Sequence, residues 1–228
     1  MTRRRVSNPL ALAVLSCLSE RPMHPYEIST TLRTRGKEHS IKLNYGSLYA
    51  VVESLQKHGL ITSRETLREG RRPERTIYEI TAEGSSEFED WLAELLSTPV
   101  RNYTSLEAGL SLMAGLPPAE VARLFEDRVV GLRIELGGIV AAEKVADDMG
   151  LPEVFSVETR FRQAMLTAEV DFVIDLAQRI RSEKLGGTEV WRRIHELRAA
   201  GMSYEQIMAD PVGNLGKEAQ ILADNIDR

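Results

Sequence analysis

Residues 44–81 have the sequence NYGSLYAVVESLQKHGLITSRETLREGRRPERTIYEIT, and this stretch decides the fold. Its first part predicts an amphipathic helix, because apolar residues recur at the i, i+3, i+4, i+7 spacing of one helix face. These residues are Leu48, Val51, Val52 and Leu55. Asn44 is a favourable N-cap and Gly59 a favourable stop, so the helix is expected between them.

The second part predicts a β-hairpin. Leu60–Leu67 and Arg75–Thr81 are rich in β-branched and aromatic side chains, and polar and apolar residues alternate along the second run. Gly70 and Pro73 lie between the runs and favour a connecting loop of about six residues. A further short strand is expected at Ile41–Leu43.

Helices are predicted on both sides of this stretch. Residues 9–20 are expected to form a buried helix capped by Asn8, and residues 25–36 a second helix that Gly36 ends. Thr81 is expected to cap a fourth helix that stops before Pro99. The order helix, helix, helix, strand, strand, helix is that of a winged helix-turn-helix, so residues 1–97 are predicted to bind DNA.

The distribution of charge supports this division. The chain has 228 residues and a formal net charge of −5, which as a total argues against a nucleic-acid partner. Residues 1–85 carry 14 Lys and Arg against 9 Asp and Glu, whereas residues 86–228 carry 15 against 25. A polyanion responds to the local field, so a charge of +5 on residues 1–85 remains compatible with DNA binding although residues 86–228 carry −10.

Four short motifs resemble the PadR family of bacterial transcriptional regulators. They are Pro22-Met23-His24-Pro25-Tyr26-Glu27-Ile28, Tyr45-Gly46-Ser47-Leu48-Tyr49, Gly59-Leu60-Ile61 and Tyr78-Glu79-Ile80-Thr81-Ala82-Glu83-Gly84. The match covers about residues 8–97. It departs from the family pattern at Pro25, where glycine is usual, and at Ala50, where proline often stands. The resemblance implies a homodimer that binds an inverted-repeat operator, and a repressor is the predicted activity.

The predicted DNA contacts lie on the exposed face of the 44–59 helix and on the hairpin. Small residues at Gly46 and Ala50 would let the helix approach base edges, and the hairpin arginines suit phosphate or a narrow minor groove. A solvated charged turn is the alternative for the arginines. For Tyr26 and Tyr45 the alternative is core packing, while the resemblance implies contact with the DNA backbone. The predicted set is Tyr26, Lys42, Asn44, Tyr45, Gly46, Ser47, Tyr49, Arg71, Arg72 and Arg75.

The second half is predicted to be all helical, with a dimerisation domain at 98–187 and a helical extension at 188–228. Two long helices with sustained apolar stripes would each be about 45 Å long, which favours a coiled-coil-like dimer. The expected dimer residues are Leu132, Leu136, Ile139, Phe161, Met165, Phe172 and Leu176. The fold class is therefore mainly α with one small β-hairpin.

An effector is the remaining functional expectation. The resemblance implies small aromatic or drug-like ligands in some members, and Trp91 and Trp191 are the candidate pocket residues, with core packing as the alternative. No metal-ligand spacing, phosphate-binding loop or nucleophile elbow supports an enzyme, and no metal or cofactor is expected. A helical protein-interaction adaptor without specific DNA binding is the alternative function, but it leaves the hairpin and the charge split unexplained.

The start of the chain resembles a secretory signal, because Arg3–Arg5 precede the apolar stretch Leu10–Leu18 and Val14-Leu15-Ser16-Cys17 loosely resembles a lipoprotein cleavage box. Pro9 suits the first turn of a helix, and this stretch is needed as the first core helix, so a cytoplasmic protein is expected. No apolar run approaches the roughly 20 residues that span a bilayer, so no membrane partner is expected.

Overall fold

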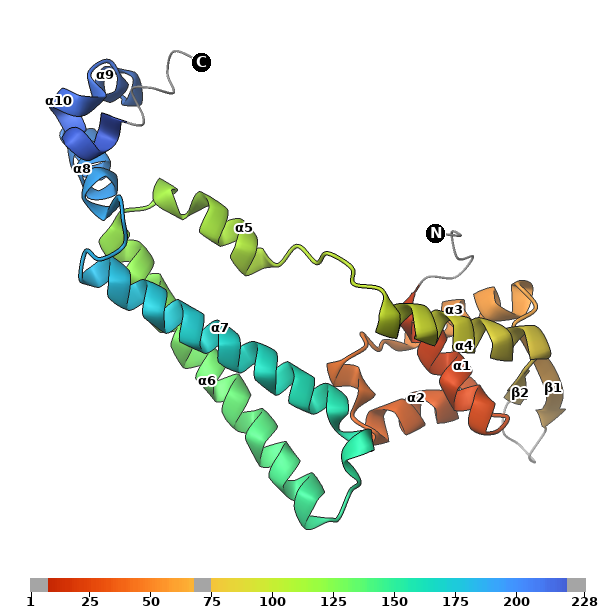
Figure 1. Cartoon of the computed structure of the whole chain (residues 1–228). Helices are drawn as coiled ribbons and strands as arrows, with labels where there is room; N and C mark the ends of the chain where they lie inside the picture. The colour runs from red at the N-terminus through yellow and green to blue at the C-terminus, as the bar shows by residue number, and fades with distance from the viewer. Residues whose placement is uncertain (1–7, 68–74, 221–228) are drawn as a thin grey trace. The chain divides into compact units, whose positions relative to one another are not determined.

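The computed structural model describes residues 8–67 and 75–220, and the chain divides into two compact units, Met1–Arg101 and Asn102–Arg228 (Figure 1). The first consists of α1 (Pro9–Glu20), α2 (Pro25–Thr34), the 3-10 turn η1 (Lys37–His39), α3 (Tyr45–Lys57), β1 (Ile61–Leu67), β2 (Arg75–Ile80) and α4 (Ala82–Ser97). This is the predicted winged helix-turn-helix.

Side-chain caps begin the helices of this unit where the sequence predicts them. The Asn8 side chain accepts a hydrogen bond from Leu10 N (3.0 Å), and Asn44 accepts one from Ser47 N (2.6 Å). Thr81 Oγ1 accepts from Gly84 N (3.0 Å) and starts α4 directly after β2. Each cap satisfies a backbone donor that lacks a partner in the first helical turn.

The hairpin strands pair antiparallel from Ile61↔Ile80 to Leu67↔Arg75, with a bulge between Ser63 and Glu65. The predicted strand at Ile41–Leu43 is wrong. Met23 N and O exchange hydrogen bonds of 3.0 Å with Tyr78, so the other edge of β2 is already paired at that residue. Ile41 N instead donates to Lys37 O (2.9 Å), which turns residues 37–41 back on themselves.

The core of the first unit lies between α1 and the elements that surround it. The helix α1 packs on α2, α3, α4 and β2, and its apolar side chains are buried on most sides. Cys17 is among them, as expected, and burial raises the pKa of its thiol to about 11. The apolar stripe of α3 closes the core from the other side and leaves the opposite face of α3 exposed.

The second unit is helical, as predicted, and its central feature is a hairpin of α6 (Pro118–Asp148) and α7 (Val157–Arg181). These long helices lie side by side in Figure 1 and pack along their lengths. The remaining elements are α5 (Ser105–Leu112), η2 (Met113–Gly115), η3 (Glu153–Phe155), α8 (Thr188–Ala199), α9 (Tyr204–Met208), α10 (Pro211–Leu215) and η4 (Lys217–Ala219). Every helix among the described residues is too short or too polar to span a bilayer.

Ion pairs link α6 to α7 on two sides of the hairpin. On the first, which we call the Arg128 side, Arg128 Nε donates to Glu169 (2.7 Å) and Arg162 donates to Glu135 (2.5 Å). On the second, the Glu126 side, Arg181 donates twice to Glu126 (2.5 and 2.6 Å). Positions 126 and 128 are about 200° apart on a helix, so the two sides flank the buried seam.

The C-terminal helices of this unit have a small core of their own. Ile207, Leu215 and Ala219 are buried there, and partly buried residues of α8 cover them. Two hydrogen bonds join α8 to the η2 turn before α6: Trp191 Nε1 donates to Leu116 O (2.8 Å), and His195 Nε2 donates to Ala114 O (2.9 Å). The extension is thereby attached to the turn that precedes the long hairpin.

Candidate nucleic-acid interface

The exposed face of α3 contains most of the predicted DNA contacts. Gly46, Tyr49 and Ala50 are exposed, and Ser47 is half-buried, while Leu48 on the opposite face is buried. A Cβ atom added at Gly46 would meet only Asn44 Oδ1, at 3.9 Å. Packing within the chain therefore does not require glycine at this position, and the space above it is open to a ligand.

The start of α2 presents a second exposed side chain. Tyr26 is 56% exposed, so core packing, the alternative considered for it, does not apply. A reciprocal cap holds this helical turn: His24 Nδ1 accepts from Tyr26 N (3.1 Å), and Glu27 Oε2 accepts from His24 N (2.9 Å). Tyr45 is the first residue of α3, but its side chain is not among those described, so its two alternatives remain.

The cations of this unit differ in whether a carboxylate already neutralises them. Arg35 donates to both oxygens of Glu20 (2.5 and 2.8 Å), which lowers the pKa of that carboxyl group. Arg64 lies 3.7 Å from Glu79. Lys42 is exposed between η1 and α3 and forms no ion pair with the described residues, so its charge is available to a phosphate.

The hairpin arginines lie largely outside the described residues. Arg71 and Arg72 fall in the segment 68–74, and Arg75 begins β2 without a described side chain. Their contact with DNA stays a prediction.

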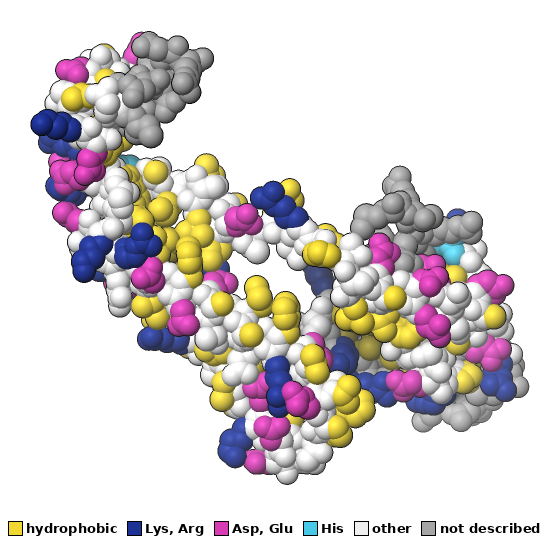
Figure 2. All heavy atoms as spheres, viewed as in Figure 1, with side chains coloured by type: hydrophobic (Ala, Val, Ile, Leu, Met, Phe, Trp, Pro, Cys, Tyr) yellow, Lys and Arg dark blue, Asp and Glu magenta, His cyan; other side chains and the backbone are white. Residues whose placement is uncertain are grey.

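The predicted dimer residues separate into two groups. Leu132, Ile139 and Leu176 are buried within the α6–α7 hairpin, and Leu136 is half-buried. Phe161, Met165 and Phe172 are exposed, and Phe161 is 67% exposed. Figure 2 shows hydrophobic side chains on the surface of this hairpin. The first group is used within the chain, whereas the second is available to a partner.

The two predicted pocket tryptophans each belong to the core of their own unit. Trp91 is 5% exposed and packs with α1, and Trp191 is 9% exposed and packs with the α6–α7 core. The packing supports the core alternative for both. No group of three or more His, Cys, Asp or Glu side chains in residues 8–67 and 75–220 is placed to hold a metal ion.

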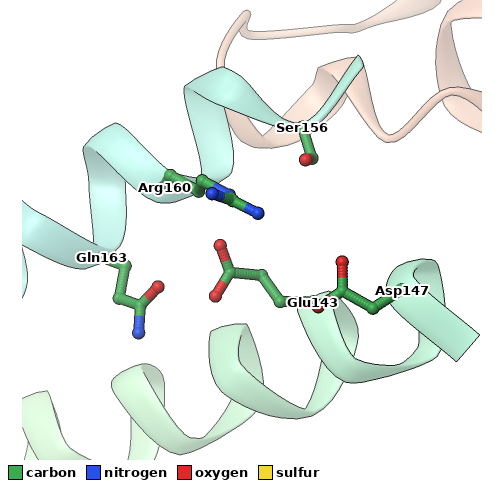
Figure 3. Close-up of a pocket in the computed structure, with 5 residues that line it drawn as sticks. All are labelled: Glu143, Asp147, Ser156, Arg160 and Gln163. Carbon is green, nitrogen blue, oxygen red and sulfur yellow. The ribbon is translucent and has the colours of Figure 1, made fainter. Parts of the chain in front are cut away.

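A polar cavity of about 230 Å³ lies where the end of α6 faces the start of α7 (Figure 3). Glu143, Asp147, Ser156, Arg160 and Gln163 line it. Several of these groups already have partners: Arg160 donates to Glu153 (2.6 Å), and the Gln163 amide donates to Glu143 (2.5 Å) when its nitrogen faces that carboxylate. These charges thus serve the hairpin itself.

Comparison with known proteins agrees with the fold. Residues 14–90 match the model of the transcriptional regulator PadR-like family. No curated protein matches the sequence of this chain. Bacillus subtilis PadR in complex with operator DNA is 17% identical, with a TM-score of 0.64 over 76% of this chain and 99% of that chain.

Two further solved structures give similar values. Bacillus subtilis PadR in complex with p-coumaric acid is 16% identical, with a TM-score of 0.61 over 77% of this chain and 99% of that one. The Vibrio cholerae virulence activator AphA is 15% identical, with a TM-score of 0.58 over 76% and 99%. Identities this low show the fold alone. The match to the transcriptional regulator PadR-like family thus covers residues 14–90, the region of the winged helix-turn-helix.

Proposed function

We propose that the chain is a homodimeric repressor that binds an inverted-repeat operator and is released by a small-molecule effector. The observation that carries the DNA-binding part is the face of α3. It combines Gly46, for which the fold has no steric need, with exposed Tyr49 and Ala50 and with Lys42, which pairs with no carboxylate among the described residues. A helix that presents small residues at its N-terminal end suits the major groove.

The positive end of α3 and its cap add to this surface. Anions are favoured at a helix N-terminus, and phosphate contacts position a protein on the duplex. Lys42 lies two residues before the cap Asn44, so a phosphate at this end would meet both a cation and the helix dipole. Bacillus subtilis PadR has been crystallised with operator DNA, which supports the same role for the similar fold here.

Dimerisation is proposed through the Arg128 side of the α6–α7 hairpin. Met165 and Phe172 lie within one helical turn of Glu169, so they share its side of α7 and are exposed. On α6, Gly131 and Gly138 alternate with Arg128 and Glu135 at three- and four-residue spacing and therefore share that side.

The glycines of α6 strengthen this proposal. An added Cβ at Gly131 or Gly138 would meet nothing within 4 Å, so packing within the chain does not explain these two glycines. Each glycine costs about 1 kcal/mol of helix stability relative to alanine. Their neighbour Ile134 is 73% exposed. Close approach of a helix from a second copy accounts for both features, and a two-fold dimer would place two α3 helices on successive DNA turns.

The adaptor alternative makes a different prediction. A helical interaction protein would use the exposed apolar residues of the second unit and would need no cationic face on the first. The first unit nevertheless presents Lys42 and Lys57 without ion pairs to the described residues. The adaptor would show no preference for any DNA sequence.

Retardation of the promoter DNA of its own and neighbouring genes, measured across a salt series, tests the DNA-binding proposal. Each phosphate contact contributes about 0.9 to the slope of log K against log salt. We expect specific binding that Lys42→Gln weakens on all sequences, with a slope lower by about one. The matched control is Arg123→Gln, because Arg123 is already paired with Glu120 and Asp127. Absence of sequence preference in the intact protein would favour the adaptor.

A further inference from the structure

The Glu126 side of the α6–α7 hairpin has a groove with an apolar floor. Its volume is about 360 Å³, within the roughly 300–1,000 Å³ usual for small-molecule sites. Val129 and Val130 of α6 and Ile174 and Ala177 of α7 supply the apolar surface. Val129 and Ala177 are buried, but Val130 is 60% exposed, so the groove leaves apolar surface in contact with water. A bound apolar group would remove that contact.

The polar groups around this floor leave one positive charge without a partner in the part of the chain that the structure describes. Glu126 and Arg181 line the groove and neutralise each other through two short hydrogen bonds. Arg133 also lines it, seven residues after Glu126 and therefore on the same side of α6. Arg133 forms no hydrogen bond or ion pair with any residue that the structure describes. The groove therefore carries a net charge of about +1.

We propose that this groove binds an amphipathic monocarboxylate, with the carboxylate on Arg133 and the apolar body along Val129, Val130, Ile174 and Ala177. A planar guanidinium with free donors matches a carboxylate in a bidentate arrangement. The Gln178 side chain also lines the groove and offers a further donor from α7. A ligand held in this way bridges both helices of the hairpin.

The groove would be the site of the effector in the proposed function, and an amphipathic monocarboxylate would be its chemical class. Only the claim that this ligand regulates DNA binding rests on the proposed function. Ligand binding is measured without DNA, so the ligand proposal and the proposed DNA-binding function can fail separately. The groove also differs from the proposed dimer surface, because the exposed aromatic residues lie on the Arg128 side. A second copy seated in the groove is the competing occupant, and it predicts that Arg133→Gln changes the dimer dissociation constant.

The test uses the full chain and three probes of equal length: octanoate, octan-1-ol and octylammonium, below their micelle concentrations. We expect octanoate to bind saturably in calorimetry and to raise the thermal midpoint. Octan-1-ol should bind at least tenfold more weakly, and octylammonium should not bind. Arg133→Gln should lower the affinity for octanoate at least tenfold and leave the affinity for octan-1-ol unchanged. Val130→Phe should fill the groove and abolish binding of both.

Lys144→Gln is the matched control, because it removes one exposed cation from the same helix outside the groove. It should leave octanoate binding unchanged. Circular dichroism should be the same for all variants, since both substituted groove residues are exposed. Equal affinity for octanoate and octylammonium, or octanoate binding that survives Arg133→Gln, would overturn the proposal. The proposal would also be overturned if no probe bound and Arg133→Gln changed the dimer dissociation constant, because a second copy would then occupy the groove.

Discussion

The backbone of Gly84 in α4 lies directly against the carbonyl group of Leu60, at the junction between α3 and the hairpin. A Cβ atom at position 84 would overlap the Leu60 carbonyl oxygen and would lie 2.9 Å from Ile80 Cγ1. The same carbonyl accepts a hydrogen bond from Thr81 N (3.1 Å), and Thr81 Oγ1 donates to Gly59 O (2.7 Å). Two of the sequence motifs that resemble the PadR family are thus in contact.

This contact predicts that Gly84→Ala destabilises the first unit. The methyl group cannot be accommodated without moving the backbone of α4 or of Leu60, and overpacking of this kind costs about 3 kcal/mol. Denaturant titration measures the loss. Gly46→Ala is the control in the same unit, because its added Cβ meets only Asn44 Oδ1 at 3.9 Å. Equal stability of the two variants would show that α4 can shift away from Leu60 at little cost.

A substitution at Gly46 should have the opposite effect to Gly84→Ala: it should lower operator affinity and leave the stability of the fold unchanged. Gly46→Leu places a bulky side chain on the exposed face of α3, so we expect at least a tenfold loss of operator affinity and an unchanged unfolding midpoint. Gln56→Leu adds a similar side chain on an exposed later turn of the same helix and should leave affinity nearly unchanged. A Gly46→Leu variant that binds its operator normally would remove the start of α3 from the interface.

The burial of Cys17 leads to two predictions. The thiol of the folded chain should react slowly, and the free energy of unfolding should fall at high pH. The Cys17 pKa of about 11, against an ordinary value of 9.0, lowers the thiolate fraction at neutral pH about 100-fold, and burial slows access further. Because the unfolded thiol ionises first, stability is lost as pH rises from about 9 to about 11. Labelling with a thiol reagent, with and without denaturant, measures the first effect.

The same cysteine supplies its own controls. Cys17→Ser gives the blank for labelling, since the chain has a single cysteine. Cys17→Ala should retain more of its stability between pH 9 and pH 11 than the parent chain retains. Rapid labelling of the folded chain would show that α1 opens far more readily than a core helix should.

The sequence predicts the first unit well, because its local signals agree with its packing. The caps Asn8, Asn44 and Thr81 and the stripe of α3 all act as their patterns indicate. The strand prediction for Ile41–Leu43 is wrong because strand propensity does not reveal that Met23 already pairs with Tyr78. Propensity is local, whereas the partner of a strand edge depends on the assembled sheet.

The second unit shows a different limit of sequence reasoning. A helical apolar stripe has the same period whether it packs within a chain or between chains. Leu132 and Leu176 therefore resembled dimer residues, although they join α6 to α7 within one chain. Arg133 was missed because an unpaired cation has no signature in sequence, and its significance appears only when its neighbours are placed.

That distinction leads to a prediction for the proposed dimer. Phe172→Glu should convert the dimer to a monomer with unchanged helix content, because Phe172 is exposed on the Arg128 side and a charge there opposes burial by a partner. Leu176→Ala should act differently, since Leu176 is buried within the hairpin: it should lower stability by about 3 kcal/mol without a matching change in dimer dissociation. Sedimentation and circular dichroism separate these effects. Dimers that persist in Phe172→Glu would place the interface elsewhere, and a monomeric parent chain would refute dimerisation altogether.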